Sequence, residues 1–375
     1  MTAHGNGRDS GNDRSSADGA GDFIDWDLAV TTAKRLTRPG PEVSRAEAKR
    51  LVDELRHAAA RSEAHVRGYT GLQAESATAP VLVVDRGAWV QANADGFKEL
   101  LRPLMSKVRS ERGEPNGFTA AVGSKVTGVE AGGLLAFLSS KVLGQFDPFY
   151  TGLAEEGTGR HGGRLLLVAP NVLQVEQELN VDPHDFRLWV CLHEETHRVQ
   201  FTAVPWLRRY VLDEMSRLVE STEVDPNKLA EMFKGGIERL AKLVKGDSDV
   251  SLIDLLQTPE QKAVVERLTA VMSLLEGHAD VVMDGVGPTV IPTVAEIRTK
   301  FTRRREGAGA LDQLLRRLLG LDAKMRQYRE GAAFVRGAVE KVGMEGFNAV
   351  WAGPENLPTR AEITDPGAWV TRIHA

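Results

Sequence analysis

The stretch WVCLHEETHRVQF, residues 189–201, contains two histidines, His193 and His197, that are four residues apart. Asp182 followed by Pro183 is typical of a helix start, so we expect one helix to run through this stretch. Residues i and i+4 lie on the same face of a helix, so the two imidazoles can bind one metal ion. The alternative is a partly exposed helix whose two histidines bind no metal.

Glu194 directly follows the first histidine and lies about 100° around the helix from it. At that angle its carboxylate is close to a metal ion without being a ligand, and it can accept a proton from a metal-bound water. Zinc lowers the pKa of such a water to about 7. The H-E-x-x-H pattern therefore predicts Zn²⁺ bound by His193 and His197, with Glu194 as the general base. Cys191 is expected to face away from the metal, in the core.

A catalytic zinc needs a third protein ligand, and the segment LLEGHADVVMD, residues 274–284, contains Glu276 and Asp280 one helical turn apart. Two carboxylates inside an apolar run repel each other and are costly to bury. Zinc bound by Glu276, with Asp280 accepting the N–H of a ligand histidine, removes this cost. The alternative is a solvated helix face, and the fallback ligands are then Glu214, Glu220 and His278.

The remaining sequence predicts a mainly α-helical fold with a small β-sheet. Capping boxes begin helices at Ser44 and Thr258, and the second of these helices is expected to stop at Gly285. Strands are expected at the start of APVLVVDRGAWVQAN, residues 79–93, and in RLLLVAP, residues 164–170. Gly277 lies within the second helix, which close packing against the histidine helix would explain. The Pro-rich end of the chain, from Trp351, is expected to be irregular.

Composition excludes several classes of protein. The chain has 375 residues and a formal net charge of −5, which gives no reason to expect binding to nucleic acid or to an anionic membrane. One cysteine excludes an intrachain disulfide and suits a reducing compartment, so we predict a cytoplasmic protein. Residues 1–22 are rich in Gly, Ser, Asp and Asn and are predicted to be a disordered tail, followed by one domain over residues 23–375. The sequence does not indicate an oligomeric state.

Four segments together resemble a known family. They are LHEETHRVQFTAVPWL (192–207), LLEGHADVVMD (274–284), KMRQYREGAAFVRGAVEKVG (324–343) and WAGPENLPTRAEITDPGAW (351–369). The chain resembles, over residues 23–374, a mainly actinobacterial family of zincin-like hydrolases that are also labelled zinc-dependent metalloproteases. One branch is associated with deazaflavin-cofactor biosynthesis. The resemblance implies a zincin-like, largely helical fold with its site at the two histidine-containing motifs, and it implies little about the substrate.

These observations predict a gluzincin-type metallopeptidase that acts on a peptide or a small amide. Tyr328 is assigned to stabilise the oxyanion, with His278 and Tyr210 as the other candidates. The strand at residues 164–170 is expected to be the sheet edge on which an extended substrate pairs. Two alternatives stay open: a non-catalytic binding or scaffold protein derived from a zincin, and an amidohydrolase of a small metabolite.

Overall fold

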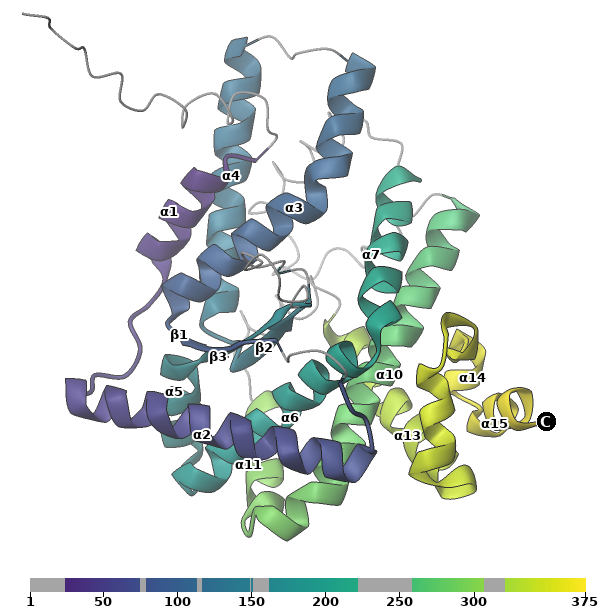
Figure 1. The fold of residues 1–375 in the computed structure, drawn as a ribbon. Coiled ribbons are helices and arrows are strands. Elements are labelled where there is room, and N and C mark those ends of the chain that lie inside the picture. The colour runs from purple at the N-terminus through teal and green to yellow at the C-terminus, as the bar shows by residue number, and fades with distance from the viewer. Residues whose placement is uncertain are drawn as a thin grey trace, which may run out of the picture.

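The histidine motif lies on helix α6 (Pro183–Ala203), which begins as the sequence predicts. The Asp182 side chain accepts a hydrogen bond from the backbone N–H of Asp185 at 2.9 Å. The computed structural model describes residues 24–74, 79–112, 117–148, 150, 162–221, 258–306 and 321–375. The predicted tail, residues 1–22, lies outside them. Figure 1 shows α6 beside the long helix α2 (Arg45–Thr70), whose capping box at Ser44 is confirmed.

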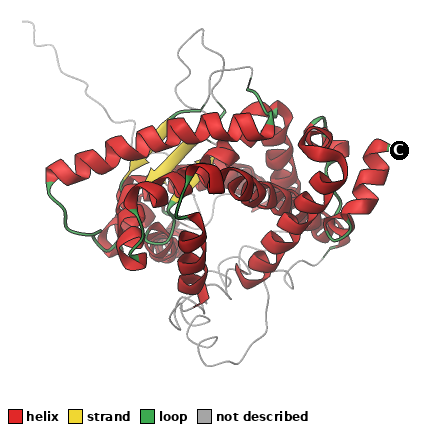
Figure 2. Ribbon diagram, turned by 90° about the horizontal axis from the view of Figure 1, so that it is seen from below, coloured by secondary structure: helices red, strands yellow, loops and turns green. Residues whose placement is uncertain are grey.

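A three-stranded sheet lies at the centre of the described fold, as Figures 1 and 2 show. Its order is β1 (Val81–Val84), β3 (Arg164–Val168), β2 (Gly144–Asp147), with β1 parallel and β2 antiparallel to β3. The strand predicted at residues 164–170 is confirmed as β3, but its predicted place at the sheet edge is wrong. All of its leucines are buried, because helices cover both faces of the sheet, and the edge nearest to α6 is β2.

Alternate residues of β3 belong to two different cores. Leu165 and Leu167 face the core that includes α2, α5 (Ala169–Leu179) and α6. Leu166 and Val168 face a smaller core. The helices of this smaller core are α1 (Trp26–Leu36), α3 (Arg86–Arg112) and α4 (Gly117–Ser139). The sheet therefore separates the α1–α3–α4 layer from the layer that carries the histidine motif (Figure 1).

The described segments of the second half of the chain are helical. Its long helices are α7 (Pro205–Glu220), α10 (Pro259–Val290), α11 (Val294–Glu306) and α13 (Leu321–Phe347). Its short ones are η2 (Asn348–Trp351), η3 (Pro354–Asn356), α14 (Arg360–Ile363) and α15 (Pro366–His374). The predicted irregular end is thus wrong from residue 360 on, because capping by Thr359 and Asp365 begins two further helices.

Helix α10 begins with the predicted capping box at Thr258 but does not stop at Gly285. It continues to Val290. Gly285 is therefore not a helix stop but a position of close packing, where a Cβ would overlap the ring of Tyr69. The predicted reason for Gly277 is also wrong. A Cβ on Gly277 would overlap the backbone of Gly331 in α13, and one on Gly331 would overlap the carbonyl of α10 residue Ser273. The backbones of α10 and α13 therefore touch next to Glu276.

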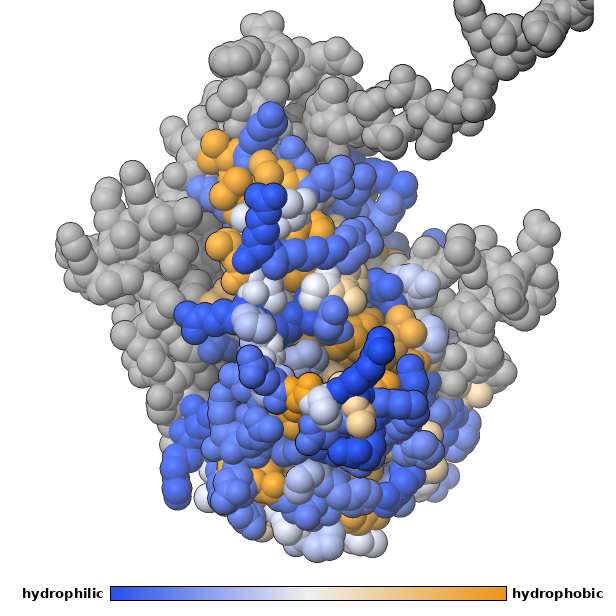
Figure 3. All heavy atoms as spheres, turned by 90° about the vertical axis from the view of Figure 1, so that its left-hand side faces the viewer, coloured by the Kyte–Doolittle hydropathy of each residue, from blue (hydrophilic) through white to orange (hydrophobic). Residues whose placement is uncertain are grey.

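The surface carries a patch of apolar side chains above a mainly hydrophilic lower half on the face drawn in Figure 3. Among the side chains that the structure describes, the exposed large apolar residues of α1 and α4 are Leu36, Val126, Val129 and Leu134. Among the described residues, no helix combines the length and the apolar character that crossing a bilayer requires.

The contact between α10 and α13 gives a stability prediction. We expect Gly331→Ala to lower the free energy of unfolding by about 1–3 kcal/mol, because the added methyl forces two backbones apart. Gly68→Ala is the matched control: this glycine lies in α2 with nothing near its missing Cβ, so alanine should stabilise by about 0.5–1 kcal/mol. Urea denaturation measures both. Equal changes in the free energy of unfolding for the two variants would contradict the backbone contact between α10 and α13.

Candidate metal centre

The structure brings the three predicted ligands together from two helices. Nε2 of His193 and Nε2 of His197 on α6 are 3.3 Å apart. Oε2 of Glu276 on α10 is 3.7 Å from the first nitrogen and 3.8 Å from the second. All three donor atoms lie within 4.8 Å of one another, and they are the one group of this kind among the described residues.

The donor set fits a tetrahedral metal ion. Ligands at about 2.0–2.1 Å from a tetrahedral zinc are about 3.4 Å from one another. The two imidazole nitrogens already have this separation, and a small rotation of the carboxylate brings Glu276 to it. The exposed side-chain fraction is 31% for His193, 13% for His197 and 19% for Glu276. A water or a substrate can therefore reach a fourth position from the His193 side.

Gln200 lies within hydrogen-bonding distance of His197 and of α10. Its Oε1 lies 3.0 Å from Nδ1 of His197, and its Nε2 donates to the backbone carbonyl of Leu275 at 2.9 Å. The Nε2 of Gln200 is also 2.9 Å from Nδ1 of His278. Gln200 was not predicted, although its spacing of three residues from His197 places it on the ligand face of α6. The orienting role predicted for Asp280 has no counterpart at His197.

His278 is fully buried and packs against aromatic rings rather than among the metal donors. Its ring stacks on Phe347 at 5.7 Å between centroids and meets Trp351 edge-on at 5.4 Å. Burial, with a smaller contribution from the charge of His197, lowers the pKa of His278 to about 3, so the ring is neutral. The structure thus uses His278 as a buried hydrogen-bonding partner of Gln200.

Glu194, the predicted general base, is buried between α6 and the edge strand β2. A Cβ on Gly144 of β2 would lie only 2.6 Å from Cγ and 2.8 Å from Cδ of Glu194. Burial, followed by repulsion from Glu276 and from Glu195, raises the pKa of Glu194 to about 8. A neighbouring divalent cation opposes both causes and favours the carboxylate. The close approach at Gly144 could not be predicted, because one glycine in a short strand has no distinctive pattern.

Arg198 connects the motif helix to α2 through a buried ion-pair network. Its Nε donates to Glu195 at 2.6 Å, its Nη1 to the carbonyl of Ala79 at 2.7 Å, and its Nη2 to Glu63 at 2.5 Å. Glu195, the second glutamate of the motif, thus faces away from the donors toward a cation. Sequence reasoning missed this network, because its members are far apart in the chain.

The other predicted residues occupy different places. Asp280 binds Arg336 at 2.7 Å and Arg298 at 3.4 Å, so two arginines compensate the acids of this helix face. Glu214 is buried and forms an ion pair with Arg267, whose Nη2 lies 2.7 Å from its Oε2. Cys191 is buried as predicted, and Tyr210 packs on Trp206. Glu220 lies at the end of α7. The side chain of Tyr328 lies outside the described part of α13.

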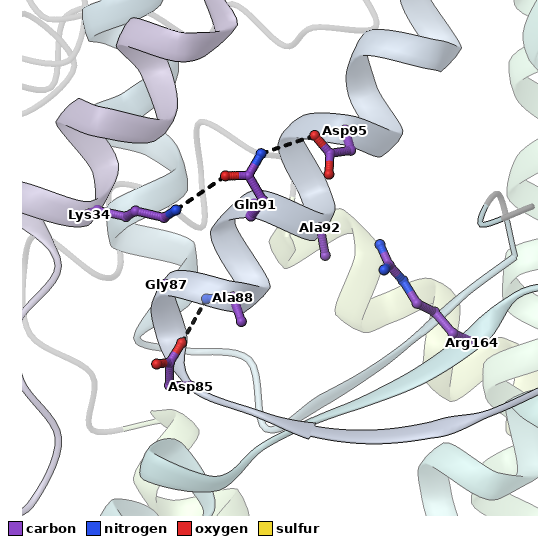
Figure 4. A pocket seen from close by; sticks show the side chains of 8 residues that line it. All are labelled: Lys34, Asp85, Gly87, Ala88, Gln91, Ala92, Asp95 and Arg164. Carbon is purple, nitrogen blue, oxygen red and sulfur yellow. Dashed lines mark hydrogen bonds between the residues drawn. The ribbon is translucent and has the colours of Figure 1, made fainter. Parts of the chain in front are cut away.

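An open pocket lies in the α1–α3–α4 layer. Figure 4 shows that its polar side chains come from α1, the start of α3 and the start of β3, and that Gln91 is hydrogen-bonded to Lys34 and Asp95. Its lining residues are Lys34, Asp85, Gly87, Ala88, Gln91, Ala92, Asp95 and Arg164. None belongs to the donor set or to its hydrogen-bonding partners, so the metal chemistry is placed outside this pocket.

Comparison with known proteins agrees with this geometry. The family described as zincin-like metallopeptidase matches residues 24–370. The chain belongs to the zincin-like metallopeptidase family. Among solved structures it is similar to one from Chloroflexus aurantiacus titled "Crystal structure of a putative hydrolase with a novel fold", with 32% identity and a TM-score of 0.67. The match covers 94% of this chain and 99% of that one. No curated protein matches the chain. The mainly helical zincin-like fold predicted from the sequence is confirmed.

The raised pKa of Glu194 predicts a pH effect in the metal-free zincin-like protein. In the folded chain the carboxyl keeps its proton up to about pH 8, whereas in the unfolded chain it ionises near 4.5, the ordinary pKa of a glutamate. Stability from this group is therefore full below about pH 4.5 and is lost as the pH rises toward about 8. Glu194→Gln has no such proton. We expect the variant to gain stability relative to the native protein over this range, in urea denaturation with chelator present. Parallel pH profiles would show that Glu194 is not buried in this way.

Proposed function

We propose that the protein is a zinc-dependent hydrolase of the gluzincin type that cleaves peptide bonds. The observation that carries this proposal is the convergence of His193, His197 and Glu276 within 4.8 Å, next to the buried Glu194. Two imidazoles and one carboxylate are a common catalytic zinc set, which leaves a fourth position for water or substrate. A purely structural site has no need of Glu194.

The residues of the chain divide the chemistry between them. Zinc bound at this centre would acidify a coordinated water and polarise the scissile carbonyl. Glu194 accepts the proton of the attacking water and then delivers it to the leaving amine. The burial of Glu194 supports this second step, because a carboxyl shielded from bulk water keeps the proton for the leaving group instead of losing it to solvent. Tyr328 is retained as the proposed oxyanion-stabilising residue.

The edge strand β2 supports a peptide as the substrate. It is the outer strand of the sheet on the side of α6, and its first residue, Gly144, packs directly on Glu194. An extended peptide that pairs with a sheet edge forms main-chain hydrogen bonds over its whole length. Pairing on β2 would hold a scissile bond next to Glu194. This geometry favours a peptide over a small amide, and it replaces β3 as the proposed pairing strand.

Two substitutions separate metal binding from catalysis. We expect Glu194→Gln to keep one zinc per chain and to lower hydrolysis by about 10²–10⁴-fold, because it removes the general base. Glu276→Ala should weaken zinc binding, because it removes a ligand. Metal content is measured by mass spectrometry of purified protein, and hydrolysis by cleavage of a mixed peptide library. The control is Glu266→Ala, an exposed acid on the same helix as Glu276, which should change neither.

Retained hydrolysis in Glu194→Gln would refute the mechanism, and undiminished zinc binding in Glu276→Ala would refute the ligand assignment. Stoichiometric zinc without cleavage of any peptide by the native protein would favour the non-catalytic alternative.

The contact between β2 and the general base gives a further prediction. Gly144→Ala should leave zinc binding intact and lower peptide hydrolysis by about 10²-fold, since its methyl displaces Glu194 from the reacting water. Gly133→Ala, in α4 with nothing near the missing Cβ, is the control and should hydrolyse peptides at the native rate. The same peptide-library assay serves both. Native activity in Gly144→Ala would show that Glu194 does not depend on this contact.

A further inference from the structure

We propose that Gln200 is the positioning residue of the metal centre. Its amide fixes His197 in the Nδ1–H tautomer and connects the helix that carries the histidines to the helix that carries Glu276. This inference rests on the proposed metal site, but it concerns side-chain chemistry that can be measured without any metal or substrate.

The orientation of the Gln200 amide follows from Leu275. A backbone carbonyl can only accept a hydrogen bond, so the atom of Gln200 that lies 2.9 Å from the Leu275 oxygen must be the N–H₂ group. The other atom, 3.0 Å from Nδ1 of His197, is then the amide oxygen, which can only accept. Nδ1 of His197 therefore carries the proton. Its Nε2 keeps the lone pair, and this is the atom that faces His193 and Glu276.

The second N–H of the amide points at His278. Its Nδ1 is 2.9 Å from Nε2 of Gln200 and acts as the acceptor. Turning the amide over would place its oxygen against the Leu275 carbonyl, which has no proton to donate. Gln200 is fully buried, so no water can take over these bonds. The Leu275 carbonyl thus allows one orientation of the amide only, and the two histidine contacts are compatible with that orientation.

The position of His278 is consistent with this role. Among the described residues its Nε2 is buried without a hydrogen-bond partner, which is a cost to folding. An apolar side chain would avoid the cost but would leave the second N–H of Gln200 unsatisfied. The ring is held by Phe347 and Trp351, so its Nδ1 stays aimed at the amide.

The same side chain acts on both halves of the donor set. Gln200 lies three residues after the ligand His197, and its partners Leu275 and His278 flank the ligand Glu276 on α10. A change at Gln200 therefore alters the tautomer of one ligand and the backbone next to another. Outer partners of this kind typically change metal affinity by about 10–100-fold when they are removed.

The first test reads the tautomer directly. In metal-free protein, imidazole ¹H–¹⁵N correlation spectra distinguish Nδ1–H from Nε2–H, and the signal of His197 is assigned by its loss in His197→Asn. We expect the Nδ1–H tautomer in the native protein and loss of this preference in Gln200→Leu. Native His197 in the Nε2–H form would overturn the proposal, and this result needs no variant at Gln200 to fold.

The second test measures zinc affinity by competition with a chelator. We expect Gln200→Leu to raise the dissociation constant by about 10–100-fold. The control is Thr196→Val, which removes an equally buried hydroxyl on the same helix that bonds only to the carbonyl of Leu192. Equal affinities of these two variants would overturn the positioning role.

Gln200→Glu separates the two parts of that role. A glutamate still accepts from Nδ1 of His197 but has no N–H for Leu275 or His278. We expect it to keep the Nδ1–H tautomer while the metal-free protein unfolds at a lower urea concentration. Loss of the tautomer in this variant would show that the amide oxygen is not its cause. A native protein that binds no zinc would instead refute the proposed function. The tautomer measurement in metal-free protein would still show whether Gln200 fixes the tautomer of His197.

Discussion

Helices α6 and α10 have to meet at one point for His193, His197 and Glu276 to face the same ion. About eighty residues of chain separate the ligands, so local structure cannot ensure this meeting, and close packing has to provide it. On one side, the backbone of α10 touches α13 at Gly277 and Gly331. On the other side, Arg198 anchors α6 to α2, and Gln200 bridges the two helices beside the donors.

The surroundings of Glu194 disfavour its charged form at this meeting point unless a cation is close by. Burial of Glu194, followed by repulsion from Glu276 and from Glu195, raises its pKa to about 8. Each neighbouring acid that serves no metal has its own cation, as Glu195 has Arg198 and Asp280 has Arg336. A metal ion bound by the two histidines and Glu276 would supply a positive charge next to Glu194. The arrangement of charges thus supports the same conclusion as the distances.

The sequence predicts well what depends on local chemistry. The helix of residues 183–203 follows from its cap and its proline, and the pairing of its histidines follows from the helical period. Glu276 could be predicted as well, because an acid in an apolar run needs a partner. The supporting residues could not be predicted in this way. Gly144 and Gly331 act through contacts between elements, and no spacing in the sequence shows which elements touch. Gln200 lies on the ligand face by its spacing from His197, but its contact with α10 has no such signal.

Diffraction from zinc-loaded crystals at the zinc absorption edge tests the central claim most directly. The anomalous signal locates the ion independently of any assumption about its ligands. We predict one strong peak in bonding contact with Nε2 of His193, Nε2 of His197 and a carboxylate oxygen of Glu276, on the side of α6 that faces α10. A peak that lacks Glu276 as a ligand, or one bound at His278 or at other acids, would contradict the account.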